Sequence, residues 1–164
     1  MVDLYLGVVR TTFHRLPAKH PQVQRLIGLL DQDLAEKDGE LHEFYDQYNK
    51  LEGVGEVMVA FVEQQPVACG TFKAWDQTTV EIKRMFTLEA YRRRGIAAQV
   101  LQALETWAYS EGYRRAVLET GKQMKAAIRL YSRCGYRPTQ NFGPYAGVDE
   151  SICFEKDLSI DPVI

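Results

Sequence analysis

The sequence predicts a mixed α/β domain, in which helices flank a single β-sheet. Three observations lead to this prediction. Short segments rich in β-branched and aromatic residues recur along the chain, bounded by Gly, Pro, Asn or Asp. Between some of them run longer segments whose apolar residues recur with helical spacing. One strand, helix and strand follow each other closely enough to form a right-handed parallel crossover.

The N-terminal part begins with a strand and continues with helices. Val8–Phe13 is rich in β-forming residues and predicts the first strand. Gln22–Glu36 carries apolar residues three and four positions apart, which predicts a helix that Pro21 can begin and Gly39 can end. A shorter helix follows, with one apolar and aromatic face: Leu41, Phe44, Tyr45 and Tyr48.

Four further strands form the centre of the predicted sheet. Glu56–Glu63 is almost continuously apolar, as expected of a strand buried on both faces. Val67–Ala74 returns after a short turn and predicts an antiparallel hairpin. The next strands are Thr79–Thr87 and Arg115–Thr120. The amphipathic helix Ile96–Glu111 lies between them, so these two strands should run parallel.

The C-terminal part adds one helix and one strand. Met124–Cys134 has its apolar side chains on one face, and Gly135 can end this helix. Asn141–Gly147 contains Gly and Pro and predicts a loop. Ser151–Lys156 predicts the last strand. This order of elements predicts a sheet of mixed direction.

The loop before the central helix reads Arg92-Arg93-Arg94-Gly95-Ile96-Ala97. Helix N-termini favour acidic side chains and a Ser, Thr, Asp or Asn cap, and this loop offers neither. A phosphate or pyrophosphate would satisfy the free N–H groups, the helix dipole and the arginines together. Gly95 would let the backbone approach that anion closely. An ordinary basic loop before a surface helix is the alternative, and the P-loop and Rossmann motifs are absent from the sequence.

The R-x-x-G-x-A pattern of this loop follows the strand V-E-I-K-R-M-F-T and precedes an amphipathic helix. It resembles the acetyl-CoA-binding motif of GNAT-superfamily N-acetyltransferases. Ala127-x-x-Leu130-Tyr131-x-x-x-Gly135-Tyr136 is similar to the second signature of that family. The close resemblance covers Thr79–Tyr136 and a looser one nearly the whole chain. It implies one GNAT domain over residues 1–164: a mixed, mostly antiparallel six- to seven-stranded sheet with a central parallel pair that splays apart, flanked by about four helices.

The resemblance also implies acetyl-CoA as co-substrate. The pantetheine arm would run between the two parallel strands, held by backbone groups of Met85 and Thr87, with a backbone N–H near Met85 polarising the thioester carbonyl. Phe86 would point to the opposite face. Where the family often has Asn, this chain has Met124, which puts one cofactor contact in question. The expected cofactor-binding residues are Met85, Phe86, Thr87, Arg92, Arg93, Arg94, Gly95, Ile96, Ala97, Ala98, Ala127 and Tyr131.

Tyr131 matches the family tyrosine that donates a proton to the leaving CoA sulfur, with a plain packing role as the alternative. Glu81 is the first candidate for the general base, and an ion pair with Lys83 or Arg84 is its alternative role. Glu119, at the end of the next strand, is the second candidate base. Tyr45, Glu119 and Tyr145 are expected to bind the acceptor, although both tyrosines also fit as packing residues.

The implied reaction transfers an acetyl group from acetyl-CoA to a primary amine by direct attack in a ternary complex. Cys134 offers an acyl-cysteine route, but no base is visibly paired with it. Transfer of a different acyl group and non-catalytic acyl-CoA binding stay open, as does the identity of the small-molecule or peptide acceptor. Residues 31–56 carry nine acidic side chains against two lysines, which fits either a solvated face or an acceptor wall that attracts a cationic amine.

The composition is that of an ordinary globular protein of 164 residues, and its net charge of −2 argues against a nucleic-acid partner. No apolar run approaches the length of a membrane helix, and the N-terminus lacks the features of a signal peptide. The three cysteines are expected to be reduced thiols in the cytoplasm. Cysteines and histidines show no metal-ligand spacing, so no metal is expected. A homodimer that pairs through the C-terminal strand stays open.

Overall fold

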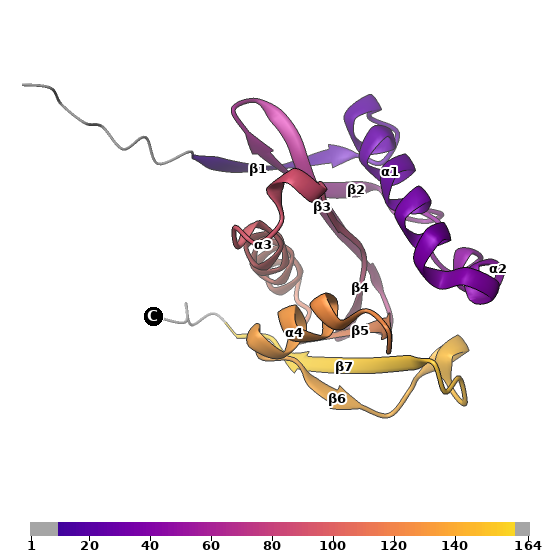
Figure 1. Cartoon of the computed structure of the whole chain (residues 1–164). Coiled ribbons are helices and arrows are strands. Elements are labelled where there is room, and N and C mark those ends of the chain that lie inside the picture. Colours follow the sequence, from indigo (N-terminus) through magenta and orange to yellow (C-terminus); the bar gives the residue numbers. More distant parts are fainter. Residues whose placement is uncertain (1–9, 160–164) are drawn as a thin grey trace, which may run out of the picture.

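The computed structural model describes residues 10–159 of the chain. Figure 1 shows one twisted sheet with helices on both faces. Its seven strands, in spatial order β1-β2-β3-β4-β5-β7-β6, are antiparallel except for the parallel pair β4–β5. The strands are β1 (Thr11–Pro17), β2 (Glu56–Val62), β3 (Gln65–Ala74), β4 (Thr79–Thr87), β5 (Arg115–Gly121), β6 (Arg137–Thr139) and β7 (Ser151–Asp157).

The helices of this region agree with the predicted number of about four. They are α1 (Pro21–Asp38), α2 (His42–Asp46), α3 (Ile96–Ser110) and α4 (Lys125–Arg133), with short 3-10 turns η1 (Gly39–Leu41), η2 (Glu89–Tyr91) and η3 (Gly143–Tyr145). The mixed, mostly antiparallel seven-stranded sheet with one parallel pair is therefore confirmed. None of the helices in the described range is long and apolar enough to cross a membrane.

Two apolar layers cover the two faces of the sheet, because successive residues of a strand point to opposite sides. On one face α1 packs against β2 and β3 through Val23, Leu26, Ile27, Leu30, Val57, Val59 and Cys69. On the other face α3 and α4 pack against the sheet through Val80, Ile82, Val100, Leu101, Leu104, Leu118, Tyr131 and Phe154. The sheet thus separates α1 from α3, as Figure 1 shows.

The parallel pair β4–β5 is joined over only three residues of each strand. Thr79–Glu81 pairs with Arg115–Val117, and beyond these residues the strands separate. The remaining parts of the two strands therefore form the sides of a gap that opens toward the N-terminus of α3. This is the splayed geometry that the family resemblance implies.

A β-bulge in β4 was not predicted. Cys69 of β3 pairs with Phe86, whereas Thr71 pairs with Lys83, so β4 carries one extra residue between these pairs. Arg84 lies in this bulge with a positive φ of 60°. The extra residue shifts the alternation, so that Met85 packs on the α3 face and Phe86 on the α1 face. The bulge thus decides which side chain of β4 points to which face.

Several predicted boundaries change in the structure. β1 begins and ends later than the predicted strand Val8–Phe13, of which Val8 and Val9 lie outside the described residues. β6 was missed because it has only three residues, one of them Pro138, and this is too short for a periodic pattern.

The possible homodimer through the C-terminal strand stays a prediction. β7 pairs with β5 along its whole length on one side, whereas on the other side β6 pairs only with Cys153–Glu155. In the described part of the chain, the sheet edges are β1 and β6.

Candidate active site

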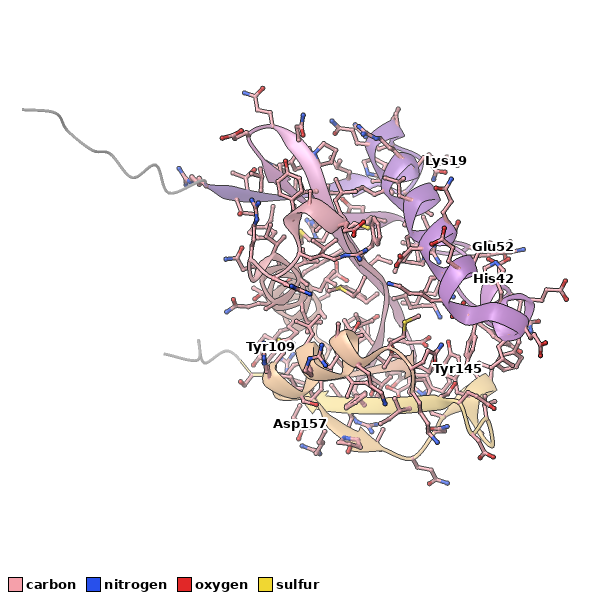
Figure 2. The ribbon with its side chains drawn as sticks, viewed as in Figure 1. Lys19, His42, Glu52, Tyr109, Tyr145 and Asp157 are labelled. Atoms are coloured by element: carbon pink, nitrogen blue, oxygen red, sulfur yellow. The ribbon has the colours of Figure 1, made fainter. Side chains whose placement is uncertain are left out.

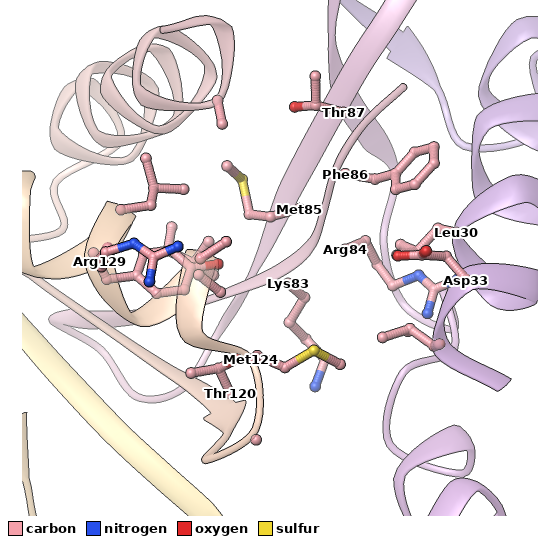
Figure 3. Close-up of a pocket in the computed structure, with 18 of the residues that line it drawn as sticks. Leu30, Asp33, Lys83, Arg84, Met85, Phe86, Thr87, Thr120, Met124 and Arg129 are labelled. Carbon is pink, nitrogen blue, oxygen red and sulfur yellow. The ribbon is translucent and has the colours of Figure 1, made fainter. Parts of the chain in front are cut away.

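A cavity of about 870 Å³ lies where β4 and β5 separate, with α1 and α2 on one side and the ends of α3 and α4 on the other. Figure 3 shows the side of this cavity formed by β4. It brings together fifteen of the sixteen predicted site residues: Tyr45, Glu81, Met85, Phe86, Thr87, Arg92, Arg93, Gly95, Ile96, Ala97, Ala98, Glu119, Ala127, Tyr131 and Tyr145. The exception is Arg94. Residues that are far apart in sequence thus form one continuous site.

The N-terminus of α3 forms the most open end of the cavity. Gly95 is the N-cap residue with a left-handed φ of 77°, and it provides no capping side chain. The first hydrogen bond of the helix runs from the Gln99 N–H to the Gly95 carbonyl at 3.2 Å. Within the described chain, the N–H groups of residues 93–98 donate to no protein acceptor. These free donors and the helix dipole together suit an anion such as a pyrophosphate.

The three arginines of the loop have different surroundings. Arg92 Nε donates to the Thr87 carbonyl at 2.9 Å, and its guanidinium lies 3.8 Å from Asp33 of α1. Arg92 therefore ties the loop to β4 and α1 while it borders the cavity. Arg93 also lines the cavity, whereas Arg94 stacks over the ring of Tyr91 at 5.3 Å outside it. A direct phosphate contact from Arg94 is thus not supported by its position.

The edge of β4 faces the gap with part of its backbone. Leu88 N–H donates to the Val67 carbonyl at 2.8 Å, so the backbone groups of Leu88 point to β3. Because hydrogen-bonding direction alternates along a strand, the groups of Thr87 and Met85 point away from β3 and into the gap. The Thr87 carbonyl is already bonded to Arg92. The Thr87 N–H and the backbone groups of Met85 remain directed into the gap, where they suit the amides of an extended ligand.

Tyr131 projects from α4 to the floor of the cavity. Its ring packs against Tyr136 and Phe154, with centroid distances of 5.9 and 6.2 Å. Burial raises the pKa of the Tyr131 phenol well above its usual value, and the charge of Glu119 adds to this shift. The phenol therefore stays protonated at neutral pH and can act as a proton donor. The packing and the acid role predicted for Tyr131 are compatible in this geometry.

The two candidate bases lie on neighbouring strands and differ in their surroundings. The Glu81 carboxylate is 3.4 Å from Lys83 Nζ and accepts a hydrogen bond of 3.5 Å from the Tyr145 hydroxyl. Burial raises the pKa of Glu119 to about 7, and the charge of Glu81 adds to this shift. The Ser151 hydroxyl and Lys83 act in the opposite direction. Glu119 thus has the pKa expected of a general base near neutral pH.

Tyr45 and Tyr145 close the end of the cavity that lies under α2. Both are buried, and they belong to an aromatic cluster with Phe44, Tyr48 and Phe142. The Tyr45 hydroxyl forms a hydrogen bond of 2.9 Å with the Ser151 hydroxyl. Figure 2 shows Tyr145 near the end of β7, below α2. Each tyrosine therefore packs with its ring, while the hydroxyl of Tyr45 is bonded to Ser151 and that of Tyr145 to Glu81.

Two charged residues of β4 were assigned no role of their own from the sequence. Arg84, whose side chain is 3% exposed, forms an ion pair with Asp31 of α1, and Figure 3 shows it directed toward that helix. Lys83 points into the cavity. The sequence contains a signal for both residues, since charged residues follow one another in a central strand. A buried charge requires a partner, so such residues are candidates for an ion pair or a site. In residues 10–159, no three His, Cys, Asp or Glu side chains group as a metal site.

Comparisons with known proteins agree with this geometry. Residues 23–136 match the acetyltransferase (GNAT) family model. Probable N-acetyltransferase 14 of Xenopus tropicalis is 34% identical over 143 residues, which are 84% of this chain and 66% of that protein. A solved GNAT family acetyltransferase from Elizabethkingia anophelis, with acetyl-CoA bound, aligns at 25% identity with a TM-score of 0.68 over 90% of this chain and 98% of its own. A Klebsiella pneumoniae structure, provisionally named an acyl-CoA N-acyltransferase, aligns at 25% identity with a TM-score of 0.77 over 92% and 99%.

The chain spans less than two thirds of the length of the curated relatives that it matches. The family match nevertheless covers well over half of the chain and includes both sequence motifs. These motifs lie at the N-terminus of α3 and in α4, where they border the same cavity. The chain therefore belongs to the GNAT acetyltransferase family.

Proposed function

We propose that this protein transfers an acetyl group from acetyl-CoA to a primary amine, by direct attack of the amine on the thioester. The observation that carries the proposal is the single cavity that joins the uncapped N-terminus of α3 to Glu119 and Tyr131. An anionic carrier would bind at one end and the reaction would take place at the other. The experiments below distinguish this reaction from transfer of a different acyl group and from acyl-CoA binding without turnover.

The cofactor end of the cavity fits the phosphates of CoA. The free N–H groups of residues 93–98 would bind the pyrophosphate, because they are aligned with the positive end of the helix dipole. Gly95 leaves open space there, since a Cβ added at this position would meet no atom within 4 Å. Arg93 would add a positive charge, and Arg92 would keep the loop in place. Backbone groups of Met85 and Thr87 would bind the pantetheine amides.

The chemistry requires a neutral amine, a polarised carbonyl and a proton for the leaving thiolate. Glu119 would accept the proton from the amine, because its raised pKa lets it exchange protons near neutral pH. The Met85 N–H would stabilise the oxyanion of the tetrahedral intermediate. Tyr131 would then donate its proton to the CoA sulfur. Each of these groups borders the gap between β4 and β5.

Glu119 suits the role of base better than Glu81. The Glu81 carboxylate is already engaged by Lys83 at 3.4 Å and by the Tyr145 hydroxyl at 3.5 Å. It would have to give up these partners to accept a proton from an amine, whereas the pKa of Glu119 is raised to about 7. We assign Glu81 the role of raising the pKa of Glu119 through its negative charge.

Direct attack is favoured over an acyl-cysteine intermediate. Cys134 borders the cavity, but burial raises the pKa of its thiol, and the charge of Glu105 adds to that shift. A thiol with a raised pKa contains little of the thiolate that would attack the thioester. The Cys134→Ala variant should therefore keep its activity.

Calorimetric titration with acetyl-CoA, CoA and ADP tests the cofactor site. The wild type should bind all three, and Gly95→Asp should bind them at least about tenfold more weakly, because it adds strain at a positive φ and a negative charge beside the phosphates. Gly112→Asp is the matched control, since Gly112 also has a positive φ but follows the other end of α3. Absence of acetyl-CoA binding by the folded wild type would remove the proposal.

Release of the CoA thiol in the presence of a panel of primary amines tests turnover. Glu119→Gln should lower the rate strongly at neutral pH, whereas Glu81→Gln should mainly shift the pH profile to lower pH, because it removes a charge that raises the pKa of Glu119. Tight acetyl-CoA binding without thiol release for any amine would point to a binding domain instead. A faster reaction with a longer acyl-CoA would show that a different acyl group is transferred, and it would leave the proposed mechanism unchanged.

A further inference from the structure

Lys83 places an amine inside the cavity where the proposed reaction would take place. Its side chain is only 8% exposed, although it lines a cavity open to solvent. Figure 3 shows the side chain reaching from β4 into the gap, on the side of Met124 and Thr120. Its charged partner is Glu81, at 3.4 Å. This buried lysine is not required by the binding or the chemistry proposed above.

The surroundings of Lys83 favour its neutral, nucleophilic form more than those of a surface lysine. Burial lowers the pKa of the Lys83 ammonium, and Lys73 on the neighbouring strand acts in the same direction. The charge of Glu81 opposes this shift. A lysine with a lowered pKa provides more free amine at neutral pH and is a better nucleophile.

Every group needed for acetyl transfer borders the same cavity as Lys83. Met85, two residues later on β4, provides the backbone N–H for the oxyanion, while Glu119 and Tyr131 provide the base and the acid. The flexible four-carbon stem of a lysine allows Nζ to turn from Glu81 toward the thioester. Lys73 gives a contrast, because it lies opposite Glu81 on β3 but does not line the cavity.

We propose that Lys83 is an internal acceptor, so that the protein acetylates its own Lys83 when no external amine occupies the cavity. This inference rests on the proposed function. Neutral Nζ attacks the thioester carbon, a C–N bond forms and the C–S bond breaks. The electron pair leaves on the CoA sulfur, which takes the proton of Tyr131, and the amine proton passes to Glu119. The products are Nζ-acetyl-lysine and free CoA thiol.

Acetylation of Lys83 would change the cavity in two ways. The amide has no charge, so Glu81 would lose its nearest cation. The acetyl group would also fill part of the space that an external amine needs. The modified protein should therefore turn over external amines more slowly than the unmodified protein, so that self-acetylation limits activity when acceptors are scarce.

Peptide mass spectrometry of the full chain, incubated with acetyl-CoA and no added amine, tests this proposal. Lys83 should gain one acetyl group faster than any other lysine, including Lys73. Tyr131→Phe and Glu119→Gln should slow acetylation of Lys83 by about a hundredfold but leave the slow acetylation of Lys73 unchanged. Lys83→Arg should abolish the fast acetylation, whereas the control Lys73→Arg should retain it.

Two results would overturn the proposal. In the first, Lys83 is acetylated no faster than Lys73, or equally fast in Tyr131→Phe, which would mean an uncatalysed reaction. In the second, Lys83 stays unmodified while the same sample binds acetyl-CoA and releases CoA to an added amine. That second result leaves the proposed function intact, whereas a lack of acetyl-CoA binding in calorimetry would remove both.

Discussion

Replacing Glu119 by Gln should change how the stability of this fold depends on pH. In the folded protein the pKa of Glu119 is raised from 4.5 to about 7, with burial as the main cause. A carboxyl with a raised pKa binds a proton more tightly in the folded than in the unfolded state. Its contribution to stability is therefore complete below pH 4.5 and is lost as the pH rises through 7. Gln carries no proton to lose, so the variant lacks this dependence.

The size of the effect follows from the shift. The rise of the pKa from 4.5 to about 7 corresponds to about 3.5 kcal/mol, at roughly 1.4 kcal/mol per pKa unit. Because Glu119 is partly exposed, screening by solvent lowers the expected value to about 2 kcal/mol. As the pH rises across this window, the free energy of unfolding of the wild type should fall by this amount relative to that of Glu119→Gln.

Urea unfolding at a series of pH values measures this difference directly, and it requires neither cofactor nor acceptor. Glu36→Gln, on the exposed side of α1, is the matched control and should follow the wild type. Parallel stability curves of the wild type and Glu119→Gln would show that Glu119 titrates normally. The argument that selects Glu119 as the base would then be refuted.

Three further substitutions test other parts of the structure. Tyr131→Phe should lower the rate of CoA thiol release by about 10²–10⁴-fold without changing acetyl-CoA affinity, and an unchanged rate would exclude Tyr131 as the acid. Gly70→Ala should lower the free energy of unfolding by about 1–3 kcal/mol, because its Cβ would lie 2.5 Å from Met85 Sδ and 2.9 Å from Leu104 Cδ1. In the control Gly28→Ala the added Cβ meets no atom within 4 Å, so this variant should not be destabilised. Asp31→Asn should cost about 1–3 kcal/mol in urea unfolding, since buried Arg84 loses its charged partner, and Asp46→Asn should cost less.

The sequence was informative wherever structure depends on near neighbours. The bounds predicted for β4 are those found, and α3 begins at the predicted residue, because apolar periodicity repeats over these segments. The uncapped N-terminus of α3, where we propose that the phosphates bind, was also visible in the sequence, since the missing cap and Gly95 are local features. The parallel direction of β4 and β5 followed from the helix between them, because such crossovers have one favoured hand.

The choice between the two carboxylates required the tertiary structure. From the sequence, Glu81 came first because it lies on the strand that leads to the arginine loop. The pKa of Glu119 depends on burial and on charges from β4 and α1, which are distant in sequence. Similarly, Arg84 finds its partner Asp31 53 residues earlier in the chain, on a helix that packs across the sheet.

The sequence by itself determined most of the elements, their order and the parallel direction of β4 and β5, and the family resemblance implied the splay of this pair and most of the residues that meet in the cavity. Only the tertiary structure decided the bulge at Arg84, the short strand β6, the different positions of the three loop arginines and the burial of Lys83. The physical reason is the range of the interactions. Periodicity and turn preference act over a few neighbouring residues, whereas desolvation and ion pairing depend on distances that exist only after the chain has folded.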